Sequence, residues 1–399
     1  MEIAIIGGGA AGFFAAITCA EANSACRVTI FERGKSVLEK VRISGGGRCN
    51  VTHACFDAKE LIKSYPRGSR ELLGPFMRFG PEDTVNWFEG RDVSLKTEAD
   101  GRMFPVSDSS FSIVDCLLQS ARNVGVKVLT STRVEVVKPL SDGRWKANGH
   151  TFDKIMVATG SSTAAWEWLS ALGHTIVAPV PSLFTFNTKD TRLRDLSGVS
   201  VYNAQLSIPG TKLSAQGPLL VTHWGLSGPA ILRLSAWGSR DLFDVGYKFP
   251  LLVNFLPENN TQKQLDLVSD LKLRQSKKTV FSNPEFQIPS RLWQHLVEAA
   301  GITPTKRWAD LSKKEVQQLT DQLARATFQI TGKSTFKEEF VTAGGVALNE
   351  VNFKTFESRI CPNLYLAGEV LNIDAITGGF NFQAAWTGGY LAGMAMAGT

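Results

Sequence analysis

Three glycines near the start of the chain have a spacing that serves phosphate binding. Gly7, Gly9 and Gly12 fit the pattern G-x-G-x-x-G and follow a short apolar run. The first glycine makes a tight turn, the second lets the backbone approach a pyrophosphate, and the third allows a helix to pack closely on a strand. Ala10 and Ala11 would open that helix, whose unpaired N–H groups and positive dipole end attract phosphate. The pattern predicts a dinucleotide site, although glycine-rich turns also occur for purely structural reasons.

An acidic residue after the second apolar run strengthens this prediction. Glu32 follows the run 27–31 and stands 20 residues after Gly12. A carboxylate at that distance can accept hydrogen bonds from the hydroxyls of a ribose. The neighbouring Arg33 leaves the type of ribose open, because the acid disfavours a 2′-phosphate whereas an arginine tolerates one.

A second glycine cluster follows about 35 residues after the first. It consists of Ser44, Gly45, Gly46, Gly47, Arg48, Cys49 and Asn50. The three glycines carry no Cβ atoms, so a flat or phosphate-bearing ligand can lie against the backbone. The arginine supplies a positive fork, and the cysteine a polarizable sulfur. The alternative interpretation of the cluster is a flexible surface loop.

The elements that must position these residues alternate between strand and helix. We predict strands at 3–6 and 27–31 and helices at 10–22 and 109–124. Two later apolar strands end in glycine, one at Thr159 and Gly160 and the other at Gly368 and Glu369. A glycine turn then opens a helix of small residues that runs to about Ala397. We therefore expect the C-terminal segment to rejoin the N-terminal sheet.

The middle of the chain has a different character. We predict a small β unit from strands at 134–137, 144–147 and 152–157, and antiparallel strands at 199–208, 212–221 and 247–255. Between the last two strands lies a loop that carries His223 and leads into a helix beginning at Pro229. Residues 260–330 have Lys, Gln and Leu at helical spacing, which indicates a helical insert.

Composition describes an ordinary globular protein. The 399 residues are 43% hydrophobic and 20% charged, with a net charge of +6 and a pI near 8.9. No apolar run approaches the ~18 residues of a membrane span, and the N-terminus lacks the basic region of a signal peptide. We therefore expect a cytoplasmic protein whose six cysteines are free thiols. No His or Cys cluster has metal-ligand spacing, so we predict no metal.

Several motifs together resemble one flavoprotein family. They are Gly7-Gly-Gly-Ala-Ala-Gly12, Ser44-Gly-Gly-Gly-Arg-Cys-Asn50, Gly101-Arg-Met-Phe-Pro-Val-Ser107, His223-Trp-Gly-Leu-Ser-Gly-Pro-Ala230, Thr342-Ala-Gly-Gly-Val346, and Leu366-Ala-Gly-Glu-Val370 with Thr377-Gly-Gly-Phe-Asn381. The set is similar to the bacterial BaiN/YhiN-like family of FAD-dependent oxidoreductases, in the glutathione-reductase-type flavoprotein clan. The resemblance spans nearly the whole chain. It departs from the family pattern at Glu39, Arg42 and His53, where a basic, an aliphatic and an asparagine residue are usual.

The resemblance implies an α/β fold with a Rossmann-like FAD-binding domain of three layers. That domain would be discontinuous, comprising 1–185 and 341–399. An antiparallel β-barrel-like substrate domain would comprise 186–256 and 331–340, and a helical insert 257–330.

The resemblance also implies the residues that contact FAD. They are Gly7, Gly9, Ala10, Ala11, Gly12, Glu32, Arg33, Lys40, Ser44, Gly45, Gly46, Gly47, Arg48, Cys49, Asn50, Val134, Thr159, Gly160, Gly368, Glu369, Gly379, Phe380 and Asn381. Within this set, backbone near Val134 would contact adenine, and Glu369 the ribityl hydroxyls. The helix opening at Gly379 would direct its dipole at the flavin N1–C2=O edge.

Four residues are candidates for catalysis on the substrate side. His223 can deliver a proton near neutral pH, although a single histidine is more often structural. Arg48 can anchor an anion or polarise a carbonyl, and Arg102 is a further candidate. Cys49 has only Cys55 nearby in sequence, which favours a packing or flavin-tuning thiol over a redox pair.

The reaction implied by the resemblance is reduction of a C=C bond conjugated to a carbonyl. The substrate would be an enone-like small molecule, or uridine in ribosomal RNA giving dihydrouridine. NAD(P)H would visit transiently as reductant, because the sequence has no second G-x-G-x-x-G domain. Lys263, Lys272, Arg274, Lys277, Lys278, Lys306 and Arg307 are candidates for an RNA-binding patch, or for an ordinary solvated face. An oxidase that uses oxygen and a non-catalytic FAD-binding module remain open, as does the oligomeric state.

Overall fold

The computed structural model describes residues 1–258, 260–334 and 341–398, which divide into two compact units. The first unit comprises Met1–Val180 and Val341–Thr399, and the second comprises Pro181–Phe340. The first unit is therefore discontinuous and uses both ends of the chain.

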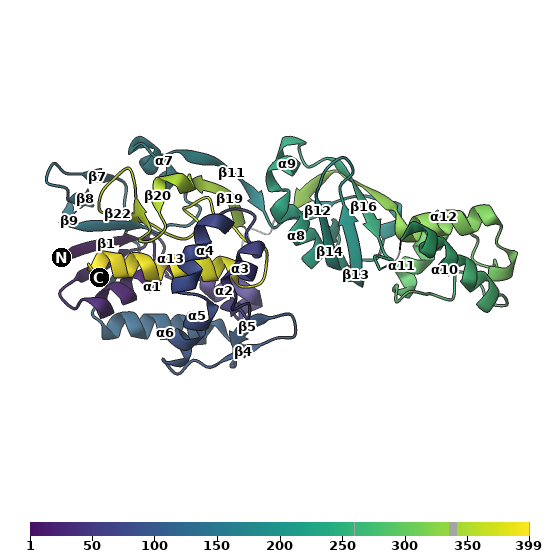
Figure 1. Ribbon diagram of the computed structural model, residues 1–399, viewed down its shortest axis with the longest axis horizontal. Helices are drawn as coiled ribbons and strands as arrows, with labels where there is room; N and C mark the ends of the chain where they lie inside the picture. Colours follow the sequence, from purple (N-terminus) through teal and green to yellow (C-terminus); the bar gives the residue numbers. More distant parts are fainter. Residues whose placement is uncertain (259, 335–340, 399) are drawn as a thin grey trace. The chain divides into compact units, whose positions relative to one another are not determined.

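The first unit is built on a seven-stranded sheet with the order β20-β21-β22-β10-β1-β2-β6 (Figure 1). Its strands are β1 (Glu2–Ile6), β2 (Arg27–Phe31), β6 (Lys127–Leu129), β10 (Lys154–Val157), β20 (Val351–Asn352), β21 (Glu357–Ser358) and β22 (Leu364–Leu366). The five strands β22, β10, β1, β2 and β6 are parallel. Parallel strands need crossover connections, and α1 (Ala10–Ala22) supplies the one between β1 and β2. The predicted N-terminal strand–helix–strand unit is confirmed.

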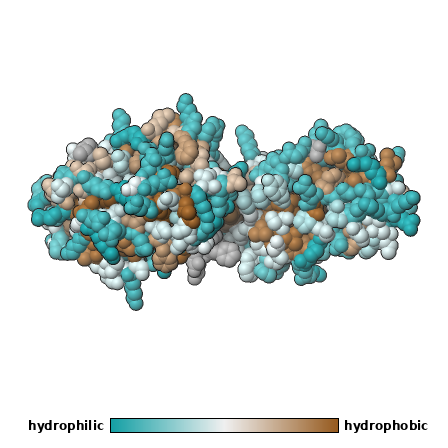
Figure 2. Space-filling view, turned by 90° about the horizontal axis from the view of Figure 1, so that it is seen from below, coloured by the Kyte–Doolittle hydropathy of each residue, from teal (hydrophilic) through white to brown (hydrophobic). Residues whose placement is uncertain are grey.

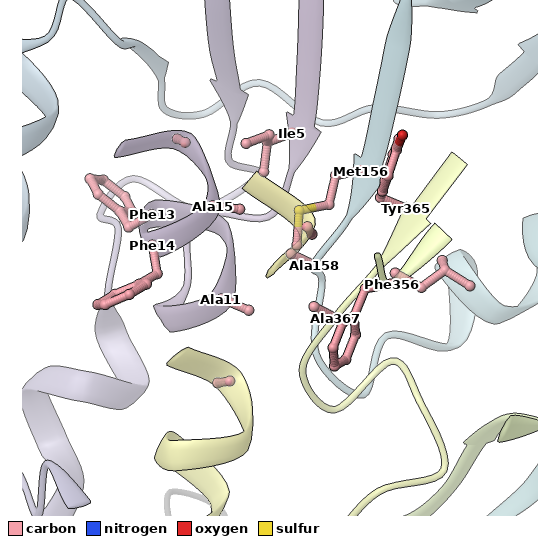
Figure 3. Close-up of a cluster of buried hydrophobic side chains, with 14 of the residues drawn as sticks. Ile5, Ala11, Phe13, Phe14, Ala15, Met156, Ala158, Phe356, Tyr365 and Ala367 are labelled. Atoms are coloured by element: carbon pink, nitrogen blue, oxygen red, sulfur yellow. The ribbon is translucent and has the colours of Figure 1, made fainter. Parts of the chain in front are cut away.

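Two helices from opposite ends of the chain pack against each other beside this sheet. In Figure 1, α1 lies alongside α13 (Phe380–Ala397). A Cβ atom on Gly389 would come within 2.7 Å of the Ala11 carbonyl oxygen, and one on Gly393 equally close to that of Ala15. Glycines therefore let the two backbones approach, and Figure 3 shows Ala11 and Ala15 in the buried cluster with Phe14. The prediction that the C-terminal segment rejoins the N-terminal sheet is confirmed.

Smaller elements complete the first unit. They are α2 (Glu39–Gly47), β3 (Thr52–His53), α3 (Ala58–Leu61), η1 (Ile62–Ser64), α4 (Ser69–Arg78), α5 (Pro81–Glu89), β4 (Leu95–Thr97), β5 (Arg102–Pro105), α6 (Ser110–Asn123), β7 (Val137–Pro139), β8 (Trp145–Ala147), β9 (His150–Phe152), α7 (Thr163–Ala171), β11 (Ile176–Ser182), β19 (Val341–Val346) and η4 (Leu348–Glu350). Strands β3, β5 and β4 form one small antiparallel sheet, and β7, β8 and β9 another.

One strand prediction needs correction. The run 152–157 was expected as a single strand of the small β unit, but it contains the end of β9 and, separately, β10 of the main sheet. Asp153 makes the corner between them. Its backbone N–H donates to the Glu2 carbonyl oxygen at 2.8 Å, and its carboxylate accepts from the Glu2 N–H at 2.7 Å. These two bonds fix the entry of β10 into the sheet.

The second unit contains a seven-stranded sheet with the order β17-β16-β13-β14-β15-β12-β18. Its strands are β12 (Thr185–Asn187), β13 (Ser200–Ser207), β14 (Ser214–Val221), β15 (Gly225–Ser227), β16 (Phe249–Asn254), β17 (Ala326–Ile330) and β18 (Gly332–Ser334). The first and last strands in this order, β17 and β18, are consecutive in the chain. One continuous segment thus joins the two edges, which gives the sheet a barrel-like form.

Helices pack onto this sheet and share its core. They are η2 (Thr191–Leu193), α8 (Pro229–Trp237), α9 (Ser239–Asp244), α10 (Thr261–Arg274), α11 (Ser290–Ala299), η3 (Trp308–Asp310) and α12 (Lys313–Ala324). One buried cluster contains Phe328 of the sheet together with Trp293 and Leu319 of the helices. The predicted helical insert 257–330 therefore includes a strand of the barrel, β17, and forms one compact unit with it. Residues 335–340 of the predicted barrel domain lie outside the described residues.

A membrane span is not found among the described residues, since none of their helices is both long and apolar enough.

Candidate cofactor and active site

Four parallel strands deliver the predicted cofactor residues to one edge of the first sheet. β1 ends at Ile6 before Gly7, and β2 ends at Phe31 before Glu32. β10 leads into Thr159 and Gly160, and β22 leads into Gly368 and Glu369. The carboxyl edge of a parallel sheet is where open α/β folds bind their ligands. The structure therefore gathers residues that are far apart in sequence.

The first glycine turn has the geometry of a phosphate cradle. Gly7 has a φ of +114°, and a Cβ atom on Gly12 would lie 2.0 Å from the Gly7 carbonyl oxygen. Gly9 is the N-cap of α1, and no side chain caps the helix there. A Cβ atom on Gly9 would meet no atom within 4 Å. The start of α1, with Ala10 and Ala11, thus has no side-chain cap and follows a glycine that borders open space, which fits a pyrophosphate.

Glu32 is held in place by the backbone on both of its oxygens. Its Oε2 accepts from the Gly8 N–H at 2.9 Å, and its Oε1 accepts from the Gly34 N–H at 2.7 Å. Its carbonyl oxygen accepts from the N–H of Thr132 at 2.8 Å. That last bond brings the segment that leads to Val134 beside Glu32, as an adenosine site requires. Arg33 is exposed.

Lys40 and Glu369 join the two ends of the chain at this edge. Lys40 Nζ lies 2.5 Å from Glu369 Oε2. A Cβ atom on Gly160 would be 3.7 Å from the same carboxylate oxygen, and one on Gly368 would touch the Ala11 side chain at 3.4 Å. Both contacts would be ordinary van der Waals distances, and glycine suits these strand ends because Gly160 and Gly368 have φ of +62° and +78°.

The second glycine cluster breaks a helix. Within α2, Ser44 has extended angles, and Gly45 and Gly46 have left-handed angles. Gly47 continues with a φ of +84° and Cys49 with a φ of +62°. A Cβ atom on Gly46 or Gly47 would meet no atom within 4 Å, so their backbone borders open space. This bare, open backbone fits the contact with a flat ring that the sequence predicts.

Asn50 connects this cluster to the start of α13. In the orientation that satisfies its amide, the nitrogen donates to the carbonyl oxygens of Thr52 at 3.0 Å and Met103 at 3.3 Å. The amide oxygen accepts from the Gly379 N–H at 3.0 Å. Asn381 closes the turn before α13, because it exchanges hydrogen bonds with the backbone of Ala375 at 3.0 and 3.2 Å.

Three supporting contacts of the α13 turn escaped the sequence analysis. The Tyr65 hydroxyl donates to the Phe380 carbonyl oxygen at 2.6 Å. Arg67 makes a bidentate ion pair with Asp374, whose side chain is fully buried. His53 stacks on Phe380 with ring centroids 4.6 Å apart. No local pattern signals these pairs, because their members stand more than 300 residues apart.

A buried polar chain fixes α13 further along. The hydroxyls of Thr52 and Thr84 donate to Gln383 Oε1 at 2.6 and 3.0 Å. Gln383 Nε2 donates to the Thr387 hydroxyl at 3.1 Å, and that hydroxyl donates to the Phe79 carbonyl oxygen at 2.8 Å. All four polar side chains of this network are buried and paired, so the network specifies one position for α13.

The two candidate arginines already have acidic partners. Arg48 Nη1 lies 2.7 Å from Glu98 and 3.5 Å from Asp108, and its guanidinium covers the Phe104 ring at 4.0 Å. The hydrogen bond that Arg48 donates to the Glu98 carboxylate raises the pKa of Arg48, so its charge is permanent. Arg102 pairs with Glu98 and Asp100 at 2.9 and 2.7 Å. Both arginines therefore belong to one ion-pair network, and their catalytic roles stay predictions.

The other two candidates lie in different units and different environments. Cys49 is fully buried, and this burial raises the pKa of its thiol to about 12. A thiol with that pKa stays protonated near neutral pH, which agrees with a packing role. His223 is exposed in the turn between β14 and β15, next to the half-exposed Trp224. Its role as a proton donor stays a prediction.

The fold and this edge of the sheet define an FAD-dependent oxidoreductase. Residues 1–395 match the HI0933-like protein Rossmann domain. The chain therefore belongs to the HI0933-like family, and the resemblance drawn from its motifs is confirmed.

Curated relatives cover almost the whole chain. The 3-dehydro-bile acid delta(4,6)-reductase of Clostridium scindens is 30% identical over 99% of both chains. The ribosomal RNA dihydrouridine synthase of Haemophilus influenzae is 26% identical over 99% of this chain and 98% of its own length. Among solved structures, the 3-ketosteroid-Δ4-(5α)-dehydrogenase of Rhodococcus jostii superposes with a TM-score of 0.51 at 15% identity, covering 99% of this chain and 97% of that chain. That likeness shows a shared fold.

Proposed function

We propose that this protein is a reductase that saturates a C=C bond conjugated to a carbonyl. The observation that supports this proposal most strongly is that both ends of the chain meet at one edge of the sheet. Glu32, Glu369, the two glycine clusters and the start of α13 lie in these segments, and the glycine backbone there borders open space. The two kinds of relative support the reaction class, because their names describe reduction of a bile-acid derivative and formation of dihydrouridine. FAD, when bound, would supply the hydride for this reduction.

The chain's own residues bind and orient the cofactor. The N–H groups at the start of α1 hold the pyrophosphate, and Glu32 accepts the adenosine ribose hydroxyls. Glu369 accepts the ribityl hydroxyls, with Lys40 limiting its movement. The residues from Ser44 to Asn50 lie along the ring. Each assignment pairs a polar group of the cofactor with a polar or bare backbone group of the site.

The N-terminus of α13 has an electrostatic task in this proposal. Gly379 is its N-cap and has no side chain to cap the first N–H groups of the helix, while Asn50 accepts the N–H of Gly379 itself. Tyr65 and the Arg67–Asp374 pair brace the turn that leads to it. The positive end of the helix dipole then stabilises negative charge on the N1–C2=O edge of the ring. Such preorganised stabilisation would favour the reduced form of the cofactor.

Two side chains are candidates to complete the reaction on the acceptor. Hydride addition at the β-carbon breaks the π bond and leaves negative charge on the carbonyl oxygen and the α-carbon. Arg48 is a permanent positive charge that can polarise the carbonyl. His223 can then place a proton on the α-carbon. The substrate is an enone-like small molecule or uridine in ribosomal RNA, and NAD(P)H would be the reductant.

The decisive test is anaerobic photoreduction of the purified holoprotein, followed by mixing with acceptors. A panel of conjugated enones and an unmodified ribosomal RNA transcript should include one that reoxidises the flavin within seconds. A non-conjugated ketone is the matched control and should leave the flavin reduced. Failure of every conjugated acceptor would remove the reductase assignment. Rapid reoxidation by air alone would favour an oxidase, and no reoxidation by either would favour a binding module.

A further inference from the structure

The positive charge of this protein belongs to one of its two units. Residues 181–340 contain 20 of the 43 Lys and Arg residues and 14 of the 37 Asp and Glu residues. This segment therefore carries a net charge of +6, and the residues of the first unit carry a net charge of zero. A positive charge that served only solubility would not need to be confined to one of the two units.

Within the second unit, two segments bring positive side chains together. The chain after α10 runs beside the chain before η3, with a β-bridge between Thr279 and Arg307. The Val280 N–H donates to the Lys306 carbonyl oxygen at 3.0 Å, and the Trp308 N–H donates to the Lys278 carbonyl oxygen at 3.0 Å. Segments 274–280 and 306–310 are thus side by side. Together they contain five Lys or Arg residues and one acid, Asp310.

Most of these positive groups are available to a partner. Arg274, Lys277, Lys278 and Arg307 are exposed. Among the described residues, no ion pair joins any of the four to an acid, and Lys278 has a hydrogen bond of 3.5 Å to the Asn283 side chain. Lys306, by contrast, is paired with Glu315 at 2.6 Å. We call the four exposed residues the basic face.

The structure also refines the patch expected from sequence. Lys272 Nζ donates to the Leu311 carbonyl oxygen at 2.5 Å, so it serves the packing of α10. Lys263 lies in the first turn of α10, 11 residues from Arg274, which is about 16 Å along a helix. These two residues and Lys306 are therefore outside the basic face. In Figure 2, the end of the second unit where α10 and α12 lie shows hydrophilic residues with hydrophobic residues among them.

We infer that the basic face binds the phosphate backbone of an RNA substrate. The inference rests on the proposed function and deepens it, since it selects RNA over a small enone as the natural acceptor. An enone needs only the site that reduces it. A polynucleotide needs contacts with successive phosphates, and clustered unpaired Lys and Arg side chains provide them.

The test compares two variants with equal loss of charge. In the first, Arg274→Ala, Lys277→Ala, Lys278→Ala and Arg307→Ala are combined. In the control, four exposed lysines of the first unit are changed, by Lys127→Ala, Lys138→Ala, Lys146→Ala and Lys354→Ala. Binding of an unmodified ribosomal RNA transcript to each full-length holoprotein is measured between about 50 and about 300 mM salt. Each variant is also mixed, after photoreduction, with the enone that wild type reduces.

We expect the basic-face variant to bind RNA at least ~10-fold more weakly at low salt. The slope of log K against log salt should fall by about 3 to 4, because each lost phosphate contact removes about 0.7 to 0.9. The control should keep the wild-type slope, and both variants should keep the wild-type rate on the enone. Wild-type RNA affinity and slope in the basic-face variant, or an equal loss in the control, would overturn the inference. Failure of the reduced wild-type protein to react with any conjugated acceptor, enone or RNA, would count against the proposed function alone.

Discussion

Lys40 and Glu369 stand 329 residues apart in the chain, and their side chains meet at 2.5 Å. Lys40 lies in α2, between the two glycine clusters, whereas Glu369 follows β22. The pair therefore ties the N-terminal and C-terminal halves of the first unit beside the proposed cofactor site. Its Lys side chain is 55% exposed and its Glu side chain 20% exposed. Solvent screens such a pair, so its value to stability is about 0.2–1 kcal/mol.

This difference in exposure predicts unequal effects on FAD binding. We expect Glu369→Ala to weaken FAD binding by tenfold or more, because hydrogen bonds to a charged group contribute about 1.5–3 kcal/mol. Lys40→Ala should weaken it several-fold less, because it removes only an exposed partner of the carboxylate. Titration of each apoprotein with FAD, followed by flavin fluorescence, measures both. Equal losses would show that the ion pair itself, and not the carboxylate, holds the cofactor.

A second prediction concerns the adenosine end of the site. Glu32→Ala should yield protein with little bound FAD, because the carboxylate is the only predicted acceptor for the ribose hydroxyls. The loss in affinity should again reach about 1.5–3 kcal/mol. Glu135→Ala is the control, since its side chain is 71% exposed and close in sequence to Val134. A Glu32→Ala protein that purifies with a full complement of FAD would contradict the assignment.

Much of this edge of the sheet could be predicted because its signals are local. The turn from Gly7 to Gly12, the strand that ends before Glu32 and the closing helix are each encoded within about 20 residues. The contacts that position the helix are not local. Arg67 with Asp374 and Tyr65 with Phe380 depend on chain segments separated by 307 and 315 residues. Only the fold brings such residues together.

The strand predicted at 152–157 is divided by a contact that is likewise not local. Its apolar residues continue through the boundary between β9 and β10, so periodicity gives no sign of a corner. The corner exists because Asp153 pairs with the backbone of Glu2, which lies 151 residues away in the sequence. The barrel strand β17 was missed for a similar reason, because its membership depends on pairing with β16.

The turn before α13 and the second glycine cluster predict different outcomes for a glycine-to-alanine substitution. Gly379 has a φ of +87°, and an added Cβ atom would lie 2.5 Å from the Thr52 carbonyl oxygen. Gly379→Ala should lower the free energy of unfolding of the apoprotein by backbone strain plus an overpacking cost of about 1–3 kcal/mol. Gly46 has a φ of +67° but open space around it, so Gly46→Ala adds strain without a clash. Urea unfolding of both apoproteins measures the difference.

FAD binding should separate these variants in another way. The Gly46→Ala methyl group would project into the open space assigned to the flavin ring, so FAD affinity should fall more than apoprotein stability does. If Gly46→Ala binds FAD like wild type, the second glycine cluster does not line the ring.

Cys49 offers a test that does not depend on activity. Burial raises the pKa of its thiol to about 12, and alkylation requires the thiolate. Iodoacetamide at about pH 8 should therefore leave Cys49 unmodified in the native protein and modify it in urea. Cys55, which is only partly buried, serves as the internal comparison, and mass spectrometry of peptides reads both sites. Native labelling of Cys49 as fast as Cys55 would contradict a buried packing thiol.

The last prediction concerns acid stability and the buried His174. Its Nδ1 lies 3.2 Å from Glu350 Oε2, and its Nε2 lies 3.0 Å from the Ser358 hydroxyl. Burial lowers the pKa of His174 below its ordinary value of 6.5, and the nearby Glu350 carboxylate opposes this effect only in part. The unfolded chain therefore binds a proton more readily than the folded protein does. The contribution of the neutral His174 to stability is complete above about pH 6.5 and is lost as the pH falls through the lowered pKa.

His174→Gln should accordingly flatten the fall in unfolding free energy between about pH 7.5 and about pH 5.5. The variant should be less stable than wild type at the upper pH, because Gln cannot reproduce both hydrogen bonds of the ring. Urea unfolding at each pH gives the two slopes. His150→Gln, on the exposed side of β9, is the matched control for loss of a histidine. Parallel pH profiles for wild type and His174→Gln would assign the acid sensitivity to other groups, among them Glu350, whose pKa is lowered by hydrogen bonds from Thr175 and His174.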